Sequence, residues 1–560
     1  MKTMKKISLI FAAAAVAAAM TGCIQEINPQ NSTVTSEQAA AAPGAFDNFV
    51  SAITSTLAGQ FVYGGTGNKY PYDYGYSSFY LQRDVMGQDI VLDSDSNWYQ
   101  TWYTCGTGLG PRYAVCQMPW TYYYGWINSC NTVIGMTGDD PEDAKQRVGA
   151  GIAYAMRAMY YMDLARMFAP KTYGLDSNAE TVPIITEDVT VDLTHNPRAT
   201  NADMWAFIVS DLDKAEVLLA DYKRTDVYTP DRSVVYGLKA RAYLVMEDWA
   251  NAEKYAKLAQ SGYTVMGEAA YTSRETGFNS PNSSWMMGLT FRPDDPNILI
   301  NDADSSWGSI MCLEVNPYVS GCGYASNYGY PLAIDRHLFE TIPATDFRKK
   351  CFVDFALEDL SKAEAIEALS AYSDYPEWVY MSGMDGHSER IGGLSLKFRL
   401  AGGAEGHDNQ YVGFVMAVPM MRVEEMFLIE AEAAGMQSED RGRQLLTAFA
   451  LTRDPNYVYG QHTDAYGNGS TPTIQNECWW QRRVEFWGEG LATFDIKRLN
   501  KGIIRSYPGT NHVENYRWNT TTPPDWMNLC IVETETKYNY DCTNNPTPIR
   551  PGEDSAEHIW

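Results

Sequence analysis

Residues 97–103 combine four aromatic rings with polar side chains, a mixture that suits recognition of sugars. Trp98 and Trp102 have flat apolar faces that can stack on a sugar ring. Asn97 and its neighbours offer planar polar groups that can hydrogen-bond to sugar hydroxyls. Packing of these rings in the core, or against a partner protein, stays open. The candidates for ligand contact in this segment are Asp95, Asn97, Trp98, Tyr99 and Trp102.

A second group of candidate rings lies in residues 262–347, a long stretch rich in Gly, Asn, Ser and Pro. A segment of this length without a regular pattern is more often functional than idle. Its candidate ligand contacts are Trp285, Trp307, Tyr324, Tyr328 and the adjoining Tyr330. The aromatic run 120–126, in contrast, is expected to begin a helix and to pack inside.

Residues 482–498 carry charges at a density that resembles acid–base machinery. Its charged residues include Arg482, Arg483, Glu485, Glu489, Asp495 and Arg498. Paired carboxylates can hydrolyse glycosides when they are held at a defined separation. Here, however, Trp480, Val484, Trp487 and Leu491 share one face of a predicted helix. We therefore interpret the charges as ion pairs that tie helices together, and we make the same interpretation of Arg422 with Glu425.

The sequence predicts neither a cofactor nor a metal site. The spacing Asp93-x-Asp95-x-Asn97 resembles the start of a calcium loop, but Trp98 stands where glycine is expected and Thr104 where the final glutamate belongs. The sequence contains no G-x-S-x-G or H-E-x-x-H motif and no phosphate-binding loop. We expect a binding protein, not an enzyme.

The first residues have the pattern of an export signal. Three lysines precede an uncharged apolar run from Ile7 to Met20, which is too short to anchor as a membrane span. Thr21 and Gly22 then precede Cys23, as small residues do in a lipobox, although Met20 replaces the usual leucine. We predict a signal peptide over 1–22 and an acyl anchor on Cys23, which would hold the protein stably at a membrane.

Composition narrows the class of partner. The chain has 560 residues and a formal charge of −26, a balance that argues against nucleic acid as a ligand. Besides Cys23 it has nine cysteines, an odd number, and Cys312–Cys322 and Cys530–Cys542 are possible local pairs.

The elements that must position the candidate residues are predicted to be helices. Residues 24–45 are polar and without apolar periodicity, and they indicate a flexible tether. Helical spacing is clearest after Asp140, with Pro141 in the first turn, and again after Asn201. Further helices are predicted over 235–246, 249–260, 361–372, 420–434 and 476–499. The pair 235–246 and 249–260 has the small residues of a tetratricopeptide-like hairpin.

Four segments together resemble the SusD/RagB family of outer-membrane nutrient-binding lipoproteins. They are Arg157–Phe168 with Val182-Pro183, Pro197–Glu216, Leu238–Leu244 with Asp248–Ala252, and Pro419–Glu432 with Arg482–Arg498. Leu491-Ala492 and the ending Asn544–Ile549 depart from the family pattern. The resemblance implies an all-α fold, with tetratricopeptide-like helical pairs as a scaffold and long ligand-binding loops.

The resemblance also implies a function. Such proteins are non-catalytic, sit in the outer membrane beside a SusC-like TonB-dependent porin and capture oligosaccharides, or in some members peptides, for import. We therefore expect a signal over 1–22, a tether over 23–45 and a single body over 46–560, with helical pairs in 46–260 and more loops in 261–560. A peptide ligand, and with less support a secreted glycoside hydrolase, stay as alternatives.

Overall fold

The computed structural model describes residues 44–60, 70–92, 97–138, 140–188, 192–299, 305–319, 323–384, 389–467 and 471–560. The predicted signal peptide, Cys23 and nearly all of the predicted tether lie outside these residues, as do Asp95 and Cys322. Residues 49–560 form one compact unit. Among the described residues, no helix is long and apolar enough to cross a bilayer.

The fold is mainly helical, as predicted. The α-helices are α3 (Ala45–Ser55), α4 (Ser78–Asp84), α5 (Gln100–Tyr103), α6 (Ala114–Thr137), α7 (Ala144–Phe168), α8 (Asn201–Leu218), α9 (Arg232–Val245), α10 (Trp249–Ala259), α11 (Glu268–Tyr271), α12 (Pro296–Leu299), α13 (Trp307–Met311), α14 (Tyr324–Asn327), α15 (Arg336–Thr341), α16 (Lys362–Leu369), α17 (Pro376–Met384), α18 (Gly403–Asp408), α19 (Gln410–Gly413), α20 (Val423–Gln437), α21 (Glu439–Ala450), α22 (Thr473–Glu485), α23 (Ala492–Arg498) and α24 (Glu533–Tyr538). Short 3-10 helices are η1 (Thr107–Leu109), η2 (Phe347–Cys351), η3 (Phe355–Asp359) and η4 (Asp525–Met527).

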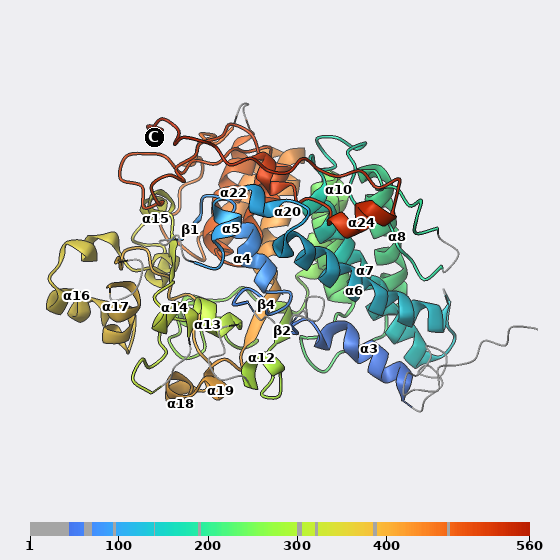
Figure 1. Cartoon of the computed structure of the whole chain (residues 1–560), viewed down its shortest axis with the longest axis horizontal. Coiled ribbons are helices and arrows are strands. Elements are labelled where there is room, and N and C mark those ends of the chain that lie inside the picture. Colours follow the sequence, from blue (N-terminus) through green and yellow to red (C-terminus); the bar gives the residue numbers. More distant parts are fainter. Residues whose placement is uncertain are drawn as a thin grey trace, which may run out of the picture. The chain divides into compact units, whose positions relative to one another are not determined.

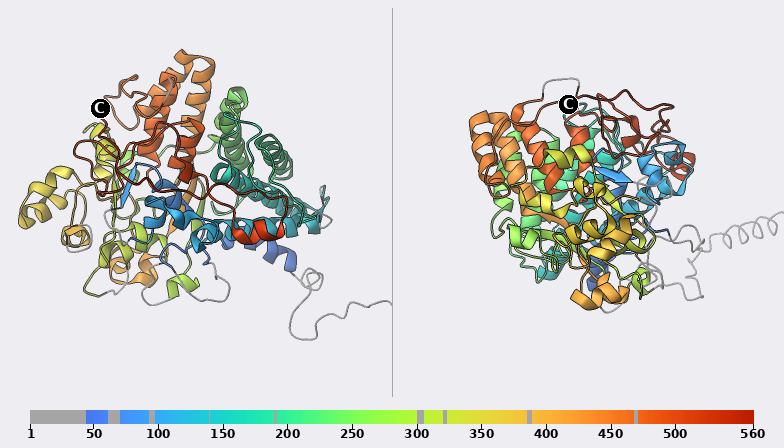
Figure 2. Two further views of the ribbon diagram at one scale, coloured as in Figure 1. Left: turned by 45° about the horizontal axis from the view of Figure 1, so that its top comes forward. Right: turned by 90° about the vertical axis from the view of Figure 1, so that its left-hand side faces the viewer.

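Long helices pack in consecutive pairs and form the scaffold. Helix α7 packs between α6 and α8, α9 packs on α10, and α10 in turn packs on α20 and its partner α21. Figure 1 shows the teal and green helices α6–α10 next to the orange helices α20–α22, and the left view of Figure 2 shows the same two groups. At Gly442, a Cβ atom would lie 2.3 Å from the Cα of Gly435, so α20 and α21 approach at a distance only glycine permits.

Helix ends differ from their predicted positions where several neighbouring residues could each cap or end the helix. Helix α7 is capped by Asp143, whose carboxylate accepts the amides of Lys145 and Gln146, and not by Asp140. The predicted helix 476–499 is two helices, because Gly488 and Gly490 adopt φ values of 76° and 78° between α22 and α23.

Two small antiparallel sheets were not predicted. Strand β1 (Ile90–Leu92) pairs with β3 (Leu332–Ile334), and β2 (Trp285–Thr290) pairs with β4 (Ala417–Arg422). Nearly all of these strand residues are buried, so their sequences lack the alternation that reveals a half-exposed strand. In the first sheet Leu92 faces Leu332, which brings the chain after β1 close to the chain before β3. Both candidate aromatic segments flank this end of the sheet.

The possible Cys530–Cys542 pair is absent, since both thiols are free. Cys530 contacts the carbonyl oxygens of Asn545 and Pro546, and Cys542 that of Thr543. Burial raises the pKa of Cys530 to about 11, so this thiol is protonated at neutral pH.

Candidate functional site

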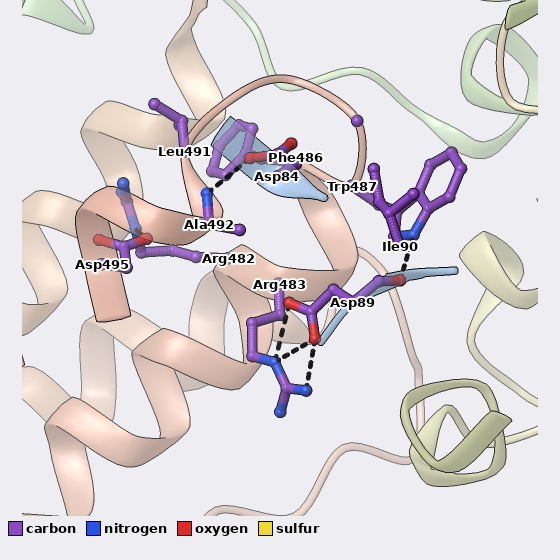
Figure 3. Close-up of a pocket in the computed structure, with 11 residues that line it drawn as sticks. Asp84, Asp89, Ile90, Arg482, Arg483, Phe486, Trp487, Leu491, Ala492 and Asp495 are labelled. Atoms are coloured by element: carbon purple, nitrogen blue, oxygen red, sulfur yellow. Dashed lines mark hydrogen bonds and ion pairs between the residues drawn. The ribbon is translucent and has the colours of Figure 1, made fainter. Parts of the chain in front are cut away.

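The charged residues of α22 and α23 are buried, and five of those singled out in the sequence each contact an opposite charge: Arg482, Arg483, Glu485, Asp495 and Arg498. Arg483 holds Asp89 at 2.6 Å, and Arg482 holds Asp495 at the same distance. Figure 3 shows the first of these pairs and Asp84 directed at the amide of Ala492. The cavity among these residues measures about 10 Å³, which is room for about one water molecule. No substrate fits there, and the ion pairs tie helices together as the sequence indicates.

Glu485 is the centre of this charged cluster. Its carboxylate accepts hydrogen bonds from Arg422 at 2.9 Å, from Arg453 at 3.0 Å and from Arg348 at 3.2 Å, and all four side chains are fully buried. Burial alone would raise the pKa of Glu485, but the three guanidinium groups lower it well below its usual range. Arg422 binds Glu424, Glu485 and Glu489, whereas Glu425 binds Arg241. The predicted structural role of both residues is confirmed, but they pair with other residues and not with each other.

An aromatic platform at the surface is the second notable feature. Trp98 has 42% of its surface exposed, and its ring lies 5.5 Å from that of Tyr70 and 6.2 Å from that of Tyr72. Tyr70 stacks on Tyr72 at 5.2 Å with an angle of 8° between the rings. Trp98 and Tyr70 therefore form the outer layer of a stacked cluster.

Buried rings support this outer layer from below. Tyr72 packs edge-on against Trp102 at 5.1 Å and against Tyr99 at 6.4 Å. The Tyr99 hydroxyl lies 2.6 Å from that of Tyr74, and burial raises the pKa of Tyr99, so its hydroxyl remains a neutral donor and acceptor. A base of packed, hydrogen-bonded rings keeps the exposed indole in one orientation, which lowers the entropy cost of binding.

Two hydrogen bonds join the same loop to the second aromatic segment. The amide of Trp98 donates to the hydroxyl of Tyr324 at 2.6 Å, and the side-chain amide of Asn97 donates to the carbonyl of Tyr330 at 3.4 Å. Tyr324 stacks on Tyr330 at 4.8 Å, and Tyr328, with 40% of its surface exposed, lies two residues before Tyr330. The two candidate segments, more than 220 residues apart, thus meet at one site.

A glycine makes the turn into this second segment. Gly323 has a φ of 104°, and a Cβ atom there would lie 2.5 Å from the Ser326 hydroxyl oxygen. The turn lets the amide of Tyr324 donate to Ser309 at 2.7 Å, which fixes the start of α14.

A family model and solved structures were compared with this chain, and both point to the same group of proteins. Residues 72–244 match a SusD-like family model described as "Starch-binding associating with outer membrane". A SusD-like carbohydrate binding protein from Bacteroides vulgatus has a similar structure, with a TM-score of 0.68 and 21% identity over 89% of this chain and 97% of that one. The fold is SusD-like.

A second similar structure is that of surface glycan-binding protein A from Bacteroides thetaiotaomicron, in complex with laminarihexaose. Its TM-score is 0.63, with 17% identity over 89% of this chain and 98% of that one. No curated protein matches by sequence. At these identities the structural similarity establishes the fold, and the predicted resemblance to the SusD/RagB family is confirmed.

The SusD-like chain does not place every predicted contact residue at the surface. Asn97, Trp102, Trp285 and Trp307 are at most 1% exposed, and Tyr99 and Tyr324 are buried too. Trp285 lies within β2, and Trp307 packs edge-on against Tyr80 and Phe398. Stacking of a ligand on these rings does not fit the structure, because apolar burial against the helical scaffold is the more favourable use of a large ring.

Of the predicted residues, the structure brings Asn97, Trp98, Tyr324 and Tyr328 together at one place. Tyr70 and Tyr72 were missed. Five tyrosines lie between residues 70 and 80, and only the tertiary structure selects the two that pack against Trp98.

Proposed function

We propose that this chain is a non-catalytic cell-surface lipoprotein that binds oligosaccharides on the platform around Trp98. The observation that carries the proposal is the exposed Trp98 ring on a buried aromatic base, in the same site as Tyr328, which is 40% exposed. A stacked indole removes water from one face of a sugar ring.

Three further points support this proposal. The matched family is described as starch-binding and associated with the outer membrane, and a structural neighbour binds laminarihexaose. The predicted anchor on Cys23 would tether the chain to the outer membrane. In such a position the protein would pass captured oligosaccharides to a SusC-like TonB-dependent transporter.

The test is a glycan panel with calorimetry on a chain of residues 24–560, which keeps the compact unit 49–560. We expect the wild type to bind at least one neutral oligosaccharide, and Trp98→Ala to weaken that binding about tenfold. The control is Tyr538→Ala, which removes a ring of 71% exposure from α24 and should leave binding unchanged. Equal affinity of Trp98→Ala and wild type would place the ligand elsewhere.

The two alternatives give different results in the same samples. A basic peptide ligand, favoured by the charge of −26, would lose affinity steeply as salt increases, whereas a neutral sugar would not. Release of reducing ends from any polysaccharide would show hydrolysis and overturn the non-catalytic part of the proposal.

A further inference from the structure

A second ring-lined cleft lies away from the Trp98 platform. Helix α15, the loop 454–466, helix α22 and residues 558–560 surround it. It consists of two adjoining cavities of about 390 and 400 Å³, which share Thr341, Gln461, His462 and Trp480 in their walls. Each volume is in the range of small-molecule sites in proteins.

Aromatic rings form much of the wall. The imidazole of His462 stacks on the Trp480 indole at 4.0 Å with an angle of 16°. In the wall of the second cavity, Trp560 stacks on His337 at 3.4 Å and retains 43% exposure. These four side chains supply flat apolar faces from four separate parts of the chain.

Glu477 holds the His462 loop in position. Its buried carboxylate accepts the His462 backbone amide at 2.8 Å and the Tyr457 hydroxyl at 2.8 Å, and it lies 2.8 Å from the imidazole Nδ1. Burial alone would raise the pKa of Glu477, but the hydrogen bonds from His462 and Tyr457 lower it. An ionised carboxylate requires a proton on Nδ1, so in the neutral ring Nε2, on the other side, is an acceptor for a hydroxyl.

Asp346, Arg483 and Asp454 in the wall already have ion-pair or hydrogen-bond partners. Asp346 binds Arg348 at 2.6 Å, and Arg483 binds Asp89 at 2.6 Å. Asp454 accepts the Thr345 hydroxyl at 2.7 Å. The remaining polar groups in the walls include the uncharged Thr341, Asn456, Gln461 and Thr463. Rings combined with neutral hydrogen-bonding groups favour a neutral ligand that has both apolar faces and hydroxyls.

We infer that this cleft is a second saccharide-binding site. The inference rests on the proposed function, because it assigns the same ligand class to another place. The chain enters β3 from Tyr328 and Tyr330 and leaves it towards His337, so the two sites lie at opposite ends of the β1–β3 sheet. Two sites on one rigid unit bind a long polysaccharide more tightly than either site alone, since the second contact is intramolecular.

The experiment compares five forms of residues 24–560 in calorimetric titrations with neutral hexasaccharides: laminari-, malto-, cello-, xylo- and mannohexaose. The forms are the wild type, Trp98→Ala, His462→Ala, Trp560→Ala and the double variant Trp98→Ala/His462→Ala. We expect residual binding in Trp98→Ala that the double variant weakens about tenfold further. Trp560→Ala removes an exposed ring without touching the Glu477 contacts, and it should also weaken binding relative to the wild type.

The control is His195→Ala, because His195 is a half-exposed histidine whose Nδ1 lies 3.3 Å from Asp541. It should leave the binding seen with the wild type unchanged, and circular dichroism with thermal unfolding should show that every variant folds. If Trp98→Ala loses all binding while His462→Ala and Trp560→Ala bind as the wild type does, the second site is overturned and the proposed function is kept. Loss only in His462→Ala and Trp560→Ala supports the cleft and overturns the platform. A wild type that binds no hexasaccharide overturns both.

Discussion

The charged cluster around Glu485 and the aromatic platform around Trp98 both contain residue types that occur in functional sites, but they differ in solvent exposure. In the cluster, the carboxylate and three guanidinium groups are fully buried and contact one another. In the platform, buried rings support an indole that is 42% exposed. Chemistry with a ligand requires access, so residue type alone does not indicate function. Burial separates the stabilising cluster from the candidate binding surface.

The largest expected effect tests the cluster. Glu485→Gln keeps the shape of the side chain but leaves three buried guanidinium groups without their shared negative charge. Loss of one partner in a buried ion cluster costs about 3–5 kcal/mol of unfolding free energy. Urea unfolding monitored by tryptophan fluorescence measures it. Oligosaccharide affinity of the folded fraction should stay at the wild-type value.

Glu340→Gln is the matched control for this variant. Glu340 pairs with Arg336 at 2.9 Å, but its side chain is 55% exposed. Loss of an exposed pair changes stability by less than about 1 kcal/mol. Equal destabilisation by the two substitutions would contradict the distinction between buried and exposed charge.

The next effect tests the platform. Trp98→Ala should weaken oligosaccharide binding about tenfold and change the unfolding free energy by no more than about 0.5 kcal/mol. Trp102→Phe, in the buried layer, should lower the unfolding free energy and leave oligosaccharide binding nearly unchanged, because it removes volume from the packed base and leaves the exposed indole in place. Titration and urea unfolding of the same two samples measure both quantities. A large stability loss in Trp98→Ala would show that this ring is part of the core.

A smaller effect is expected from the link between the two aromatic segments. Tyr324→Phe removes the hydroxyl that accepts the Trp98 amide at 2.6 Å and leaves both rings in place. A net hydrogen bond contributes about 1 kcal/mol, so we expect that loss of stability and about threefold weaker binding through a looser Trp98. The control is Tyr318→Phe, which removes a hydroxyl at a site of 69% exposure. It should change neither the unfolding free energy nor oligosaccharide binding.

The apolar periodicity of the long helices made the scaffold predictable from the sequence. The candidate site depends instead on contacts between segments that are far apart in the sequence. The small residues of 235–260 indicated the α9–α10 hairpin, with ends within a few residues of those observed. The sequence could not choose between Trp98 and Trp102, because both belong to one short aromatic run. That choice depends on Tyr72 and on Tyr324, and the β1–β3 pairing brings the second of these close to the loop. Buried strands of three residues leave no pattern that a single sequence reveals.

The last expected effect is a change in pH dependence within the buried charged region. Asp84 accepts the amides of Gly490 at 2.8 Å and Ala492 at 3.1 Å, and burial raises its pKa to about 7 from an ordinary value near 3.8. Between these two values the folded chain keeps a proton that the unfolded chain has lost. The contribution of Asp84 to stability is therefore fully present below about pH 4 and falls as pH rises towards about 7.

Asp84→Asn removes this titration. The stability of the wild type relative to the variant should fall between about pH 4 and pH 7 and stay constant above that range. Urea unfolding at several pH values measures it, with Asp440→Asn, at an exposed carboxylate of α21, as the control. A difference that rises with pH would mean that the two amides and Arg83 favour the ionised form more than burial opposes it. Oligosaccharide binding at the platform should not follow this pH dependence, because Trp98 does not titrate and lies in the other region.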